Sequence, residues 1–178
     1  MSVTQRWVAS SLQDGYPAVA DMDLDGKPEV VLVGSGRVSV LEGATGAVIA
    51  GPLNTPTTGC TGSCTANRGG PPTIADFDGD GRPEIGIAGG YSDSVYDDYR
   101  EGEPIPEGIT ANPGELFVRW SIPTQDHSSN ATGSSVFDCQ GDGAAEVVYA
   151  DECYLRVYSG VDGTVQLEWP NTSGTIHE

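Results

Sequence analysis

Acidic side chains recur at alternate positions in three short segments of the chain. The pattern Asp-x-(Asp/Gln)-x-Asp-Gly-x-x-Glu begins at Asp21, at Asp76 and at Asp138. Ca²⁺ takes about six to eight oxygen ligands, and a tightly coiled chain brings positions one, three and five of such a segment to one point. Glycine at position six permits the sharp turn that a Cβ would oppose. Each segment therefore predicts a calcium loop.

In such a loop, position seven is expected to give a backbone carbonyl and position nine a carboxylate that closes the ligand shell. The predicted ligands are Asp21, Asp23, Asp25, the carbonyl of Lys27 and Glu29 in site one; Asp76, Asp78, Asp80, the carbonyl of Arg82 and Glu84 in site two; and Asp138, Gln140, Asp142, the carbonyl of Ala144 and Glu146 in site three. We expect about three Ca²⁺ ions, one in each loop. Because Gln140 offers only a neutral amide oxygen, site three is predicted to bind most weakly.

A metal-free acidic turn is the simpler interpretation of any one loop, but three copies in register favour a metal. The β-rich flanks exclude helical EF-hands, and the long repeat excludes nonapeptide β-helix repeats. Mg²⁺ is disfavoured because it retains waters and requires a rigid octahedron.

The charge balance of the chain agrees with cation binding. The sequence has 26 acidic and 8 basic residues, for a formal net charge of −18. The loops hold four, four and three of the acids, and the others are ordinary surface. So negative a surface repels nucleic acid and anionic membranes, and no apolar run is long enough to cross a bilayer. We therefore expect no nucleic-acid partner and no membrane insertion.

Each loop joins two β-rich runs and so lies at the tip of a hairpin. The three hairpins cover residues 16–33, 71–88 and 134–149, and further strands are expected at 38–41, 47–49, 115–122, 154–158 and 165–169. Four strands per copy is the count of a propeller blade. The sequence thus predicts an all-β fold of about three four-stranded antiparallel blades. Blade 1 is expected at about 15–53, blade 2 at about 70–122 with an inserted loop over 89–114, and blade 3 at about 133–170, with 1–14 and 171–178 as connecting ends.

The run Val-Ala-Asp-Met-Asp-Leu-Asp-Gly-Lys-Pro-Glu-Val-Val, which ends at Val31, and its two relatives resemble the FG-GAP/VCBS repeat family. That family includes the calcium-binding blades of integrin α-subunit propellers and many secreted bacterial proteins. The resemblance covers nearly the whole chain apart from two long loops. It implies β-propeller blades, calcium at the loop ligands, and an extracellular, secreted or cell-surface location. Since a closed propeller has at least about four blades, three copies predict a homo-oligomer or part of a larger propeller.

Three tryptophans form a second repeated feature. Trp7, Trp120 and Trp169 each end a presumed fourth strand, and we expect their rings to fill the space between neighbouring sheets. Stacking against a carbohydrate is the alternative role.

Four cysteines suggest an oxidising compartment. Of the three full pairings that four cysteines allow, we favour Cys60–Cys64 and Cys139–Cys153. Free thiols or a zinc site are the alternatives, and the spacing matches no zinc ribbon.

No motif indicates an enzyme. His127 and His177 have no nucleophile motif beside them, and a triad is recognised by geometry rather than composition. We expect a calcium-binding extracellular repeat protein that acts as a binding, adhesion or structural assembly module. A lectin-like carbohydrate-binding module, or an accessory domain of a secreted enzyme, is the alternative. In the expected insert, Tyr91, Tyr96 and Tyr99 are candidate contacts for a glycan or an extracellular protein.

Overall fold

The computed structural model describes residues 4–9, 15–60, 69–89, 91–99, 105–126 and 132–171. Within these ranges the chain forms twelve strands and no helix. Accordingly, no helix in these ranges is long and apolar enough to cross a bilayer.

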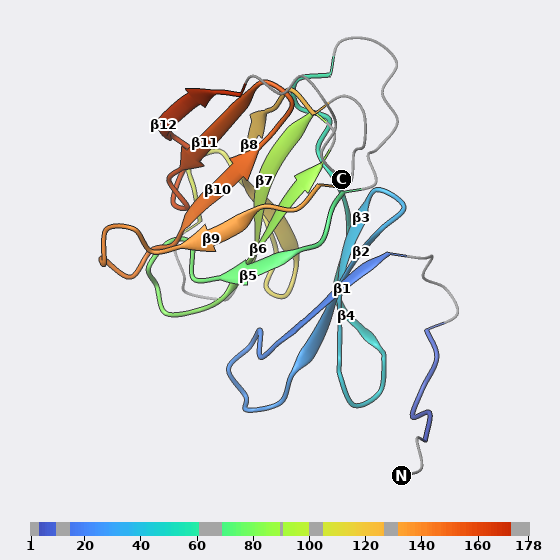
Figure 1. Ribbon diagram of the computed structural model, residues 1–178. Coiled ribbons are helices and arrows are strands. Elements are labelled where there is room, and N and C mark those ends of the chain that lie inside the picture. The colour runs from blue at the N-terminus through green and yellow to red at the C-terminus, as the bar shows by residue number, and fades with distance from the viewer. Residues whose placement is uncertain are drawn as a thin grey trace.

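The strands pair in chain order into three four-stranded antiparallel sheets (Figure 1). The first sheet contains β1 (Tyr16–Ala20), β2 (Glu29–Gly34), β3 (Arg37–Leu41) and β4 (Val48–Asn54); the second contains β5 (Thr73–Ala75), β6 (Glu84–Gly89), β7 (Ser92–Asp98) and β8 (Leu116–Pro123); the third contains β9 (Ser135–Phe137), β10 (Glu146–Ala150), β11 (Tyr154–Tyr158) and β12 (Val165–Pro170). The predicted all-β class with four strands for each sequence copy is confirmed.

Successive side chains of a strand point to opposite faces of the sheet, and this alternation determines which of them lie in the core. In β2, buried and half-buried residues alternate, with Val31 and Val33 fully enclosed. Such a strand has one face against a neighbouring sheet and the other toward solvent. All six residues of β6 are buried instead, because the second sheet is covered on both faces.

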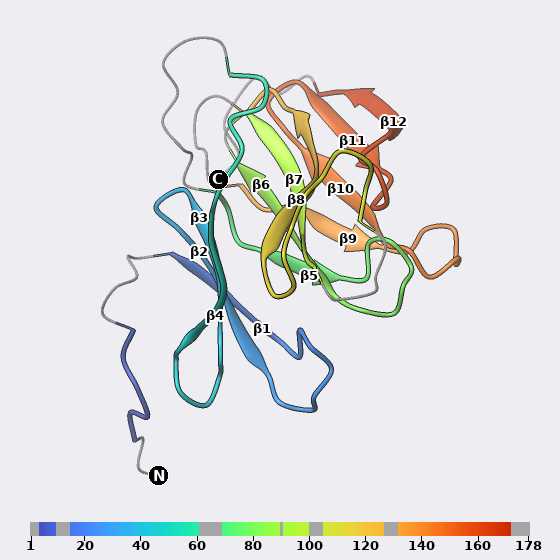
Figure 2. The same cartoon turned by 180° about the vertical axis from the view of Figure 1, so that it is seen from behind.

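Two apolar clusters join the three sheets. One packs Val31, Val33, Val38 and Val40 of the first sheet against residues of the second, such as Ile87. The other packs the second sheet against the third. Figure 2 shows the second sheet, green to yellow, between the blue first sheet and the orange third sheet. The three sheets therefore form an open stack rather than a closed ring.

The prediction that 89–114 is an inserted loop is wrong for residues 92–98, which form the central strand β7. Its composition is polar, yet several of its side chains have hydrogen-bond partners. Ser94 donates to Ser121 at 2.9 Å, and Asp97 accepts from Arg119 at 2.9 Å. Tyr96 is fully buried in the core, so it is not available as a ligand contact.

The predicted Cys139–Cys153 disulfide is also wrong, because both residues are free thiols. Cys139 follows β9 and Cys153 follows β10, so the two lie at opposite ends of β10. A five-residue strand spans roughly 17 Å, far beyond the reach of a disulfide. Cys60 is disulfide-bonded, whereas Cys64 lies outside the described residues, so the Cys60–Cys64 pairing stays a prediction.

Candidate metal centres

The three acidic loops connect the first two strands of the three sheets, where the sequence places them. In each loop the first aspartate accepts a hydrogen bond from the backbone N–H of the glycine at position six. The donor–acceptor distances are 2.9 Å from Gly26 to Asp21, 2.8 Å from Gly81 to Asp76 and 3.0 Å from Gly143 to Asp138. This bond holds the coil that directs the loop's carboxylates toward one point.

The glutamate at position nine is the other constant feature of the loops. Each one is at most 2 % exposed and accepts a hydrogen bond from the backbone N–H of position two. The distances are 2.9 Å from Met22 to Glu29, 2.6 Å from Phe77 to Glu84 and 2.7 Å from Cys139 to Glu146. A carboxylate is costly to bury without partners, so one hydrogen bond leaves it in need of further positive charge.

The backbone at position four of each loop has a positive φ angle, which the sequence pattern did not reveal. Its φ angle is 60° at Leu24, 80° at Gly79 and 73° at Gly141. The glycines at position six also have positive φ, between 86° and 96°. Glycine tolerates this region and leucine does so at a cost, so the loop backbone bends twice and Leu24 is a strained member of site one.

The acidic side chains converge in two of the three loops. Asp76, Asp78, Asp80 and Glu84 each offer an oxygen within 4.8 Å of the others, as do Asp21, Asp23 and Glu29. Such clusters match the all-oxygen shells that Ca²⁺ prefers. Asp25 is absent from the first cluster because it forms a 2.7 Å ion pair with Lys27.

Site three is built differently. Its carboxylates form no such cluster among the described residues. Gln140 donates instead to Gln166 on β12 at 3.0 Å. Backbone N–H groups, led by that of Gly143, lower the pKa of Asp138, so its negative charge is already stabilised. Of the three loops, site three therefore requires a cation least.

In sites one and two, by contrast, the pKa values of several carboxylates are raised. Burial, and then the nearby charges of Asp78 and Asp97, raise the pKa of Glu84 to about 9. Burial is also the main cause that raises the pKa of Glu29 and of Asp78. These carboxylates are destabilised as anions by desolvation and mutual repulsion, and a bound divalent cation would remove both penalties.

One oxygen in site one tests directly whether the residues fit a cation. In the part of the chain that the structure describes, Oδ1 of Asp21 is buried without a hydrogen-bond partner. The same atom accepts from position four in the other loops, at 2.7 Å from Gly79 to Asp76 and 2.6 Å from Gly141 to Asp138. A buried carboxylate oxygen without a donor is rare in folded proteins. It fits a ligand atom whose partner is a metal ion, so the donor set of site one suits Ca²⁺.

The side chains of two arginines beside site two have roles that the sequence did not indicate, although the carbonyl of Arg82 was a predicted ligand. Arg119 binds Asp78 at 2.7 Å and Asp97 at 2.9 Å, so it partly neutralises the cluster and fixes the orientation of Asp78. Arg82 donates to the carbonyl of Met22 in loop one at 3.3 Å. The two loops are thereby joined across the interface of the first and second sheets. Arg119 lies on β8, at the far edge of the sheet from β5, so its contact with the acidic loop gives no sequence signal at fixed spacing.

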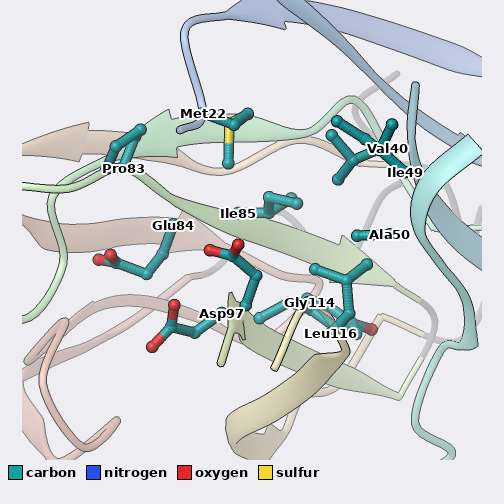
Figure 3. Close-up of a pocket in the computed structure, with 12 residues that line it drawn as sticks. Met22, Val40, Ile49, Ala50, Pro83, Glu84, Ile85, Asp97, Gly114 and Leu116 are labelled. Atoms are coloured by element: carbon teal, nitrogen blue, oxygen red, sulfur yellow. The ribbon is translucent and has the colours of Figure 1, made fainter. Parts of the chain in front are cut away.

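A cavity of about 130 Å³ lies beside site two at the interface between the first and second sheets. Figure 3 shows Glu84 at one end of it, and Val40, Ile49 and Ala50 at the other. The position-nine glutamate therefore lies between the acidic loop and an apolar space.

A comparison with protein families supports this arrangement for part of the chain. Residues 21–87 match the family described as FG-GAP-like repeat, and this range contains sites one and two and strands β2 to β5. The resemblance to FG-GAP/VCBS repeats is thereby confirmed for that part of the chain.

No curated protein matches. Among solved structures, the chain is similar to the V. cholerae biofilm matrix protein Bap1, with 25% identity and a TM-score of 0.49. The match covers 86% of this chain, which spans only 19% of that one.

Proposed function

We propose that this chain is a calcium-binding extracellular module in which Ca²⁺ at sites one and two holds the loops that organise each sheet. The main support is the convergence of carboxylates around a buried glutamate in each of these loops, together with Oδ1 of Asp21, which has no hydrogen-bond partner among the described residues. A second support is the match to the FG-GAP-like repeat over residues 21–87, a range that includes both loops. Binding, adhesion or structural assembly, rather than catalysis, is the role we assign.

Within the proposal, each residue has a distinct task. The aspartates at positions one, three and five would supply side-chain oxygens. Glu29 and Glu84 would close the shells from inside the protein. The carbonyls of Lys27 and Arg82 are proposed as the backbone ligands. Ca²⁺ would supply the charge that offsets the repulsion within each cluster.

The proposal is tested by thermal unfolding with and without calcium. A ligand that binds only the folded state stabilises it by about 2.7 kcal/mol when present at about 100 times its Kd. Two such sites correspond to a rise of roughly 10–20 °C in Tm for a chain of this size. We expect EGTA to lower Tm by this amount and excess Ca²⁺ to restore it, with Mg²⁺ much less effective.

Isothermal titration calorimetry then counts the ions and assigns them. Glu84→Gln should remove one binding event and most of its share of the Tm shift. Asp162→Asn is the matched control, since Asp162 is an exposed loop acid outside the three motifs. An identical Tm in EGTA and in Ca²⁺, or no calcium binding by the wild-type chain, would contradict the proposal.

A further inference from the structure

The side chain of Arg82 extends from the acidic loop of the second sheet to that of the first. We call residues 21–29 loop one and residues 76–84 loop two. Arg82 stands at position seven of loop two, where its backbone carbonyl is the proposed ligand of site two. Its guanidinium donates to the carbonyl of Met22 at 3.3 Å and lies 3.6 Å from a carboxylate oxygen of Asp98. Arg82 therefore belongs to site two through its backbone and contacts loop one through its side chain.

Met22, at position two of loop one, connects this contact to the ligands of site one. Its N–H donates to Glu29, the proposed closing ligand, at 2.9 Å. Its carbonyl, which accepts from Arg82, belongs to the same planar peptide group as the N–H of Asp23, and Asp23 is another proposed ligand. A restraint on the Met22 carbonyl therefore restrains the backbone between two ligands of site one.

The side chain of Met22 strengthens the connection between the loops. It is buried in the apolar cluster that joins the first and second sheets, together with Ile85. It also lines the same cavity as Pro83 and Glu84 of loop two (Figure 3). Position two of loop one thus meets the last residues of loop two through both its carbonyl and its side chain.

Loop three is joined to loop two in another way. Its position seven is Ala144, whose side chain has no hydrogen-bond donor. The N–H of Ala145 donates instead to the carbonyl of Asp76 at 2.8 Å. Among the described residues, a side chain at position seven thus links only sites one and two, the two sites whose carboxylates converge.

The charge of Arg82 and its position predict opposite effects on calcium binding. A guanidinium beside two acidic clusters repels a cation in either of them, so its charge alone should weaken binding. By holding Met22, however, it orders loop one before an ion arrives, and an ordered loop loses less entropy on binding. Asp98 offsets part of the guanidinium charge, since both side chains of this pair are mostly buried, at 18 % and 16 % exposed. We therefore expect the effect of position to be the larger.

We propose that Arg82 is a positioning residue shared by sites one and two, through which an ion in site two tightens calcium binding at site one. This inference rests on the proposed calcium sites. An ion held by the carbonyl of Arg82 and by Glu84 would restrain the backbone on both sides of Pro83, and with it the guanidinium that holds Met22. By linkage, an ion in site one would tighten site two by the same factor.

Heteronuclear NMR in a series of calcium buffers tests the coupling site by site. The N–H groups of Gly26 and Gly81 bond the first aspartate of loop one and of loop two, so their signals report the two sites separately. The midpoint is the free Ca²⁺ concentration at which half of a signal's change has occurred. Glu84→Gln, which removes a ligand of site two only, should raise the midpoint at Gly26 by about fivefold or more.

Arg82→Met tests the residue itself, because it keeps the backbone carbonyl and an unbranched side chain but removes the guanidinium. It should also raise the midpoint at Gly26 by about fivefold. Combining it with Glu84→Gln should raise that midpoint no further, since both changes break one connection. If Arg82→Met does not melt cooperatively in Ca²⁺, Arg82→Gln takes its place with the same expectation. Arg37→Met is the matched control, an exposed arginine on β3, and should change both midpoints by less than about twofold.

Three results would overturn the inference. The first is a lower midpoint at Gly26 in Arg82→Met, which would show that charge outweighs position. The second is a midpoint at Gly26 that does not respond to Glu84→Gln, and the third is a double variant in which the two effects multiply. In each case the wild-type chain still binds calcium and the proposed function stands. Wild-type signals that do not change with Ca²⁺ would contradict the proposed function as well.

Discussion

Asp93 lies on the central strand β7 with no exposed surface, and neither carboxyl oxygen has a hydrogen-bond partner in the described part of the chain. Burial raises its pKa to about 7, and the nearby backbone N–H of Ser94, which does not meet hydrogen-bond geometry, opposes this only in part. Around it lie the hydroxyl groups of Tyr96, Tyr149 and Tyr158. Burial raises the pKa of all three, and the charge of Asp93 adds to the effect. Among the described groups that affect the pKa of Asp93, only this N–H favours the ionised aspartate.

The consequence is a stability that falls as pH rises. Below pH 3.8, the pKa of an unperturbed aspartate, the carboxyl is protonated in both the folded and unfolded states. Between that pH and about 7, only the unfolded chain releases the proton, so ionisation favours unfolding. A difference of about three pKa units corresponds to about 4 kcal/mol. Roughly 3 kcal/mol of this should be lost between about pH 5 and about pH 8.

Asp93→Asn keeps the shape of the side chain and removes its titration. We expect urea unfolding in constant Ca²⁺ to show a pH dependence that is shallower than wild type by roughly 3 kcal/mol over that range. The matched control Glu107→Gln neutralises an exposed carboxyl and should leave the wild-type slope almost unchanged. Equal slopes for wild type and Asp93→Asn would refute the reasoning, since Asp93 would then be ionised or solvated in the folded protein.

Three further outcomes follow from the loops and the thiols. Asp76→Ala should weaken calcium affinity in calorimetry by about tenfold or more, whereas Gln140→Ala should have a smaller effect on total binding, because only the first removes a charged ligand; equal losses would contradict the ranking of the sites. Leu24→Gly should raise the free energy of unfolding in Ca²⁺ by about 0.5–1 kcal/mol, because glycine relieves the positive φ, and a destabilised variant would show that the Leu24 side chain matters more than its backbone. Cys139 and Cys153 should both react with Ellman's reagent in the native protein, and protection of the pair would indicate a disulfide after all.

The repeat made the fold largely predictable from the sequence. Each acidic loop fixes a hairpin, and the β-rich runs after it supply the remaining strands, so β11 was placed at its observed residues. Strand β7 was missed because Ser, Asp and Gly-rich surroundings are typical of loops. Several of its polar side chains, though not Asp93, bond to other segments, as when Ser92 donates to the carbonyl of Pro56. Sequence patterns do not report such long-range partners.

The candidate metal sites were predictable only in outline. Spacing identified the carboxylates, since periodicity and charge are both visible in a sequence. The neutral Gln140 marked site three as the weakest, but the sequence did not show that the oxygens converge in sites one and two only, or that Gln140 bonds Gln166. That difference depends on β12, which is far along the chain from the loop. The calcium ligands, the absence of catalysis at His127 and His177, and the domain limits remain predictions, and both histidines lie outside the described residues.

In the first and third sheets, the acidic loop packs against the glycine-containing turn between the third and fourth strands, at residues 42–47 and 159–164. A Cβ on Gly43 would overlap the carbonyl of Pro28, and a Cβ on Gly160 would overlap that of Ala145. Both carbonyls belong to position eight of the sheet's own acidic loop, next to the buried glutamate. Gly43 and Gly160 also accept hydrogen bonds from the indole N–H groups of Trp7 and Trp120. Each of these glycines therefore rests on the acidic loop of its own sheet while it holds a tryptophan from another segment. Since tightly packed interiors transmit displacement, an ion bound in the loop of the first sheet would also restrain the turn that receives Trp7.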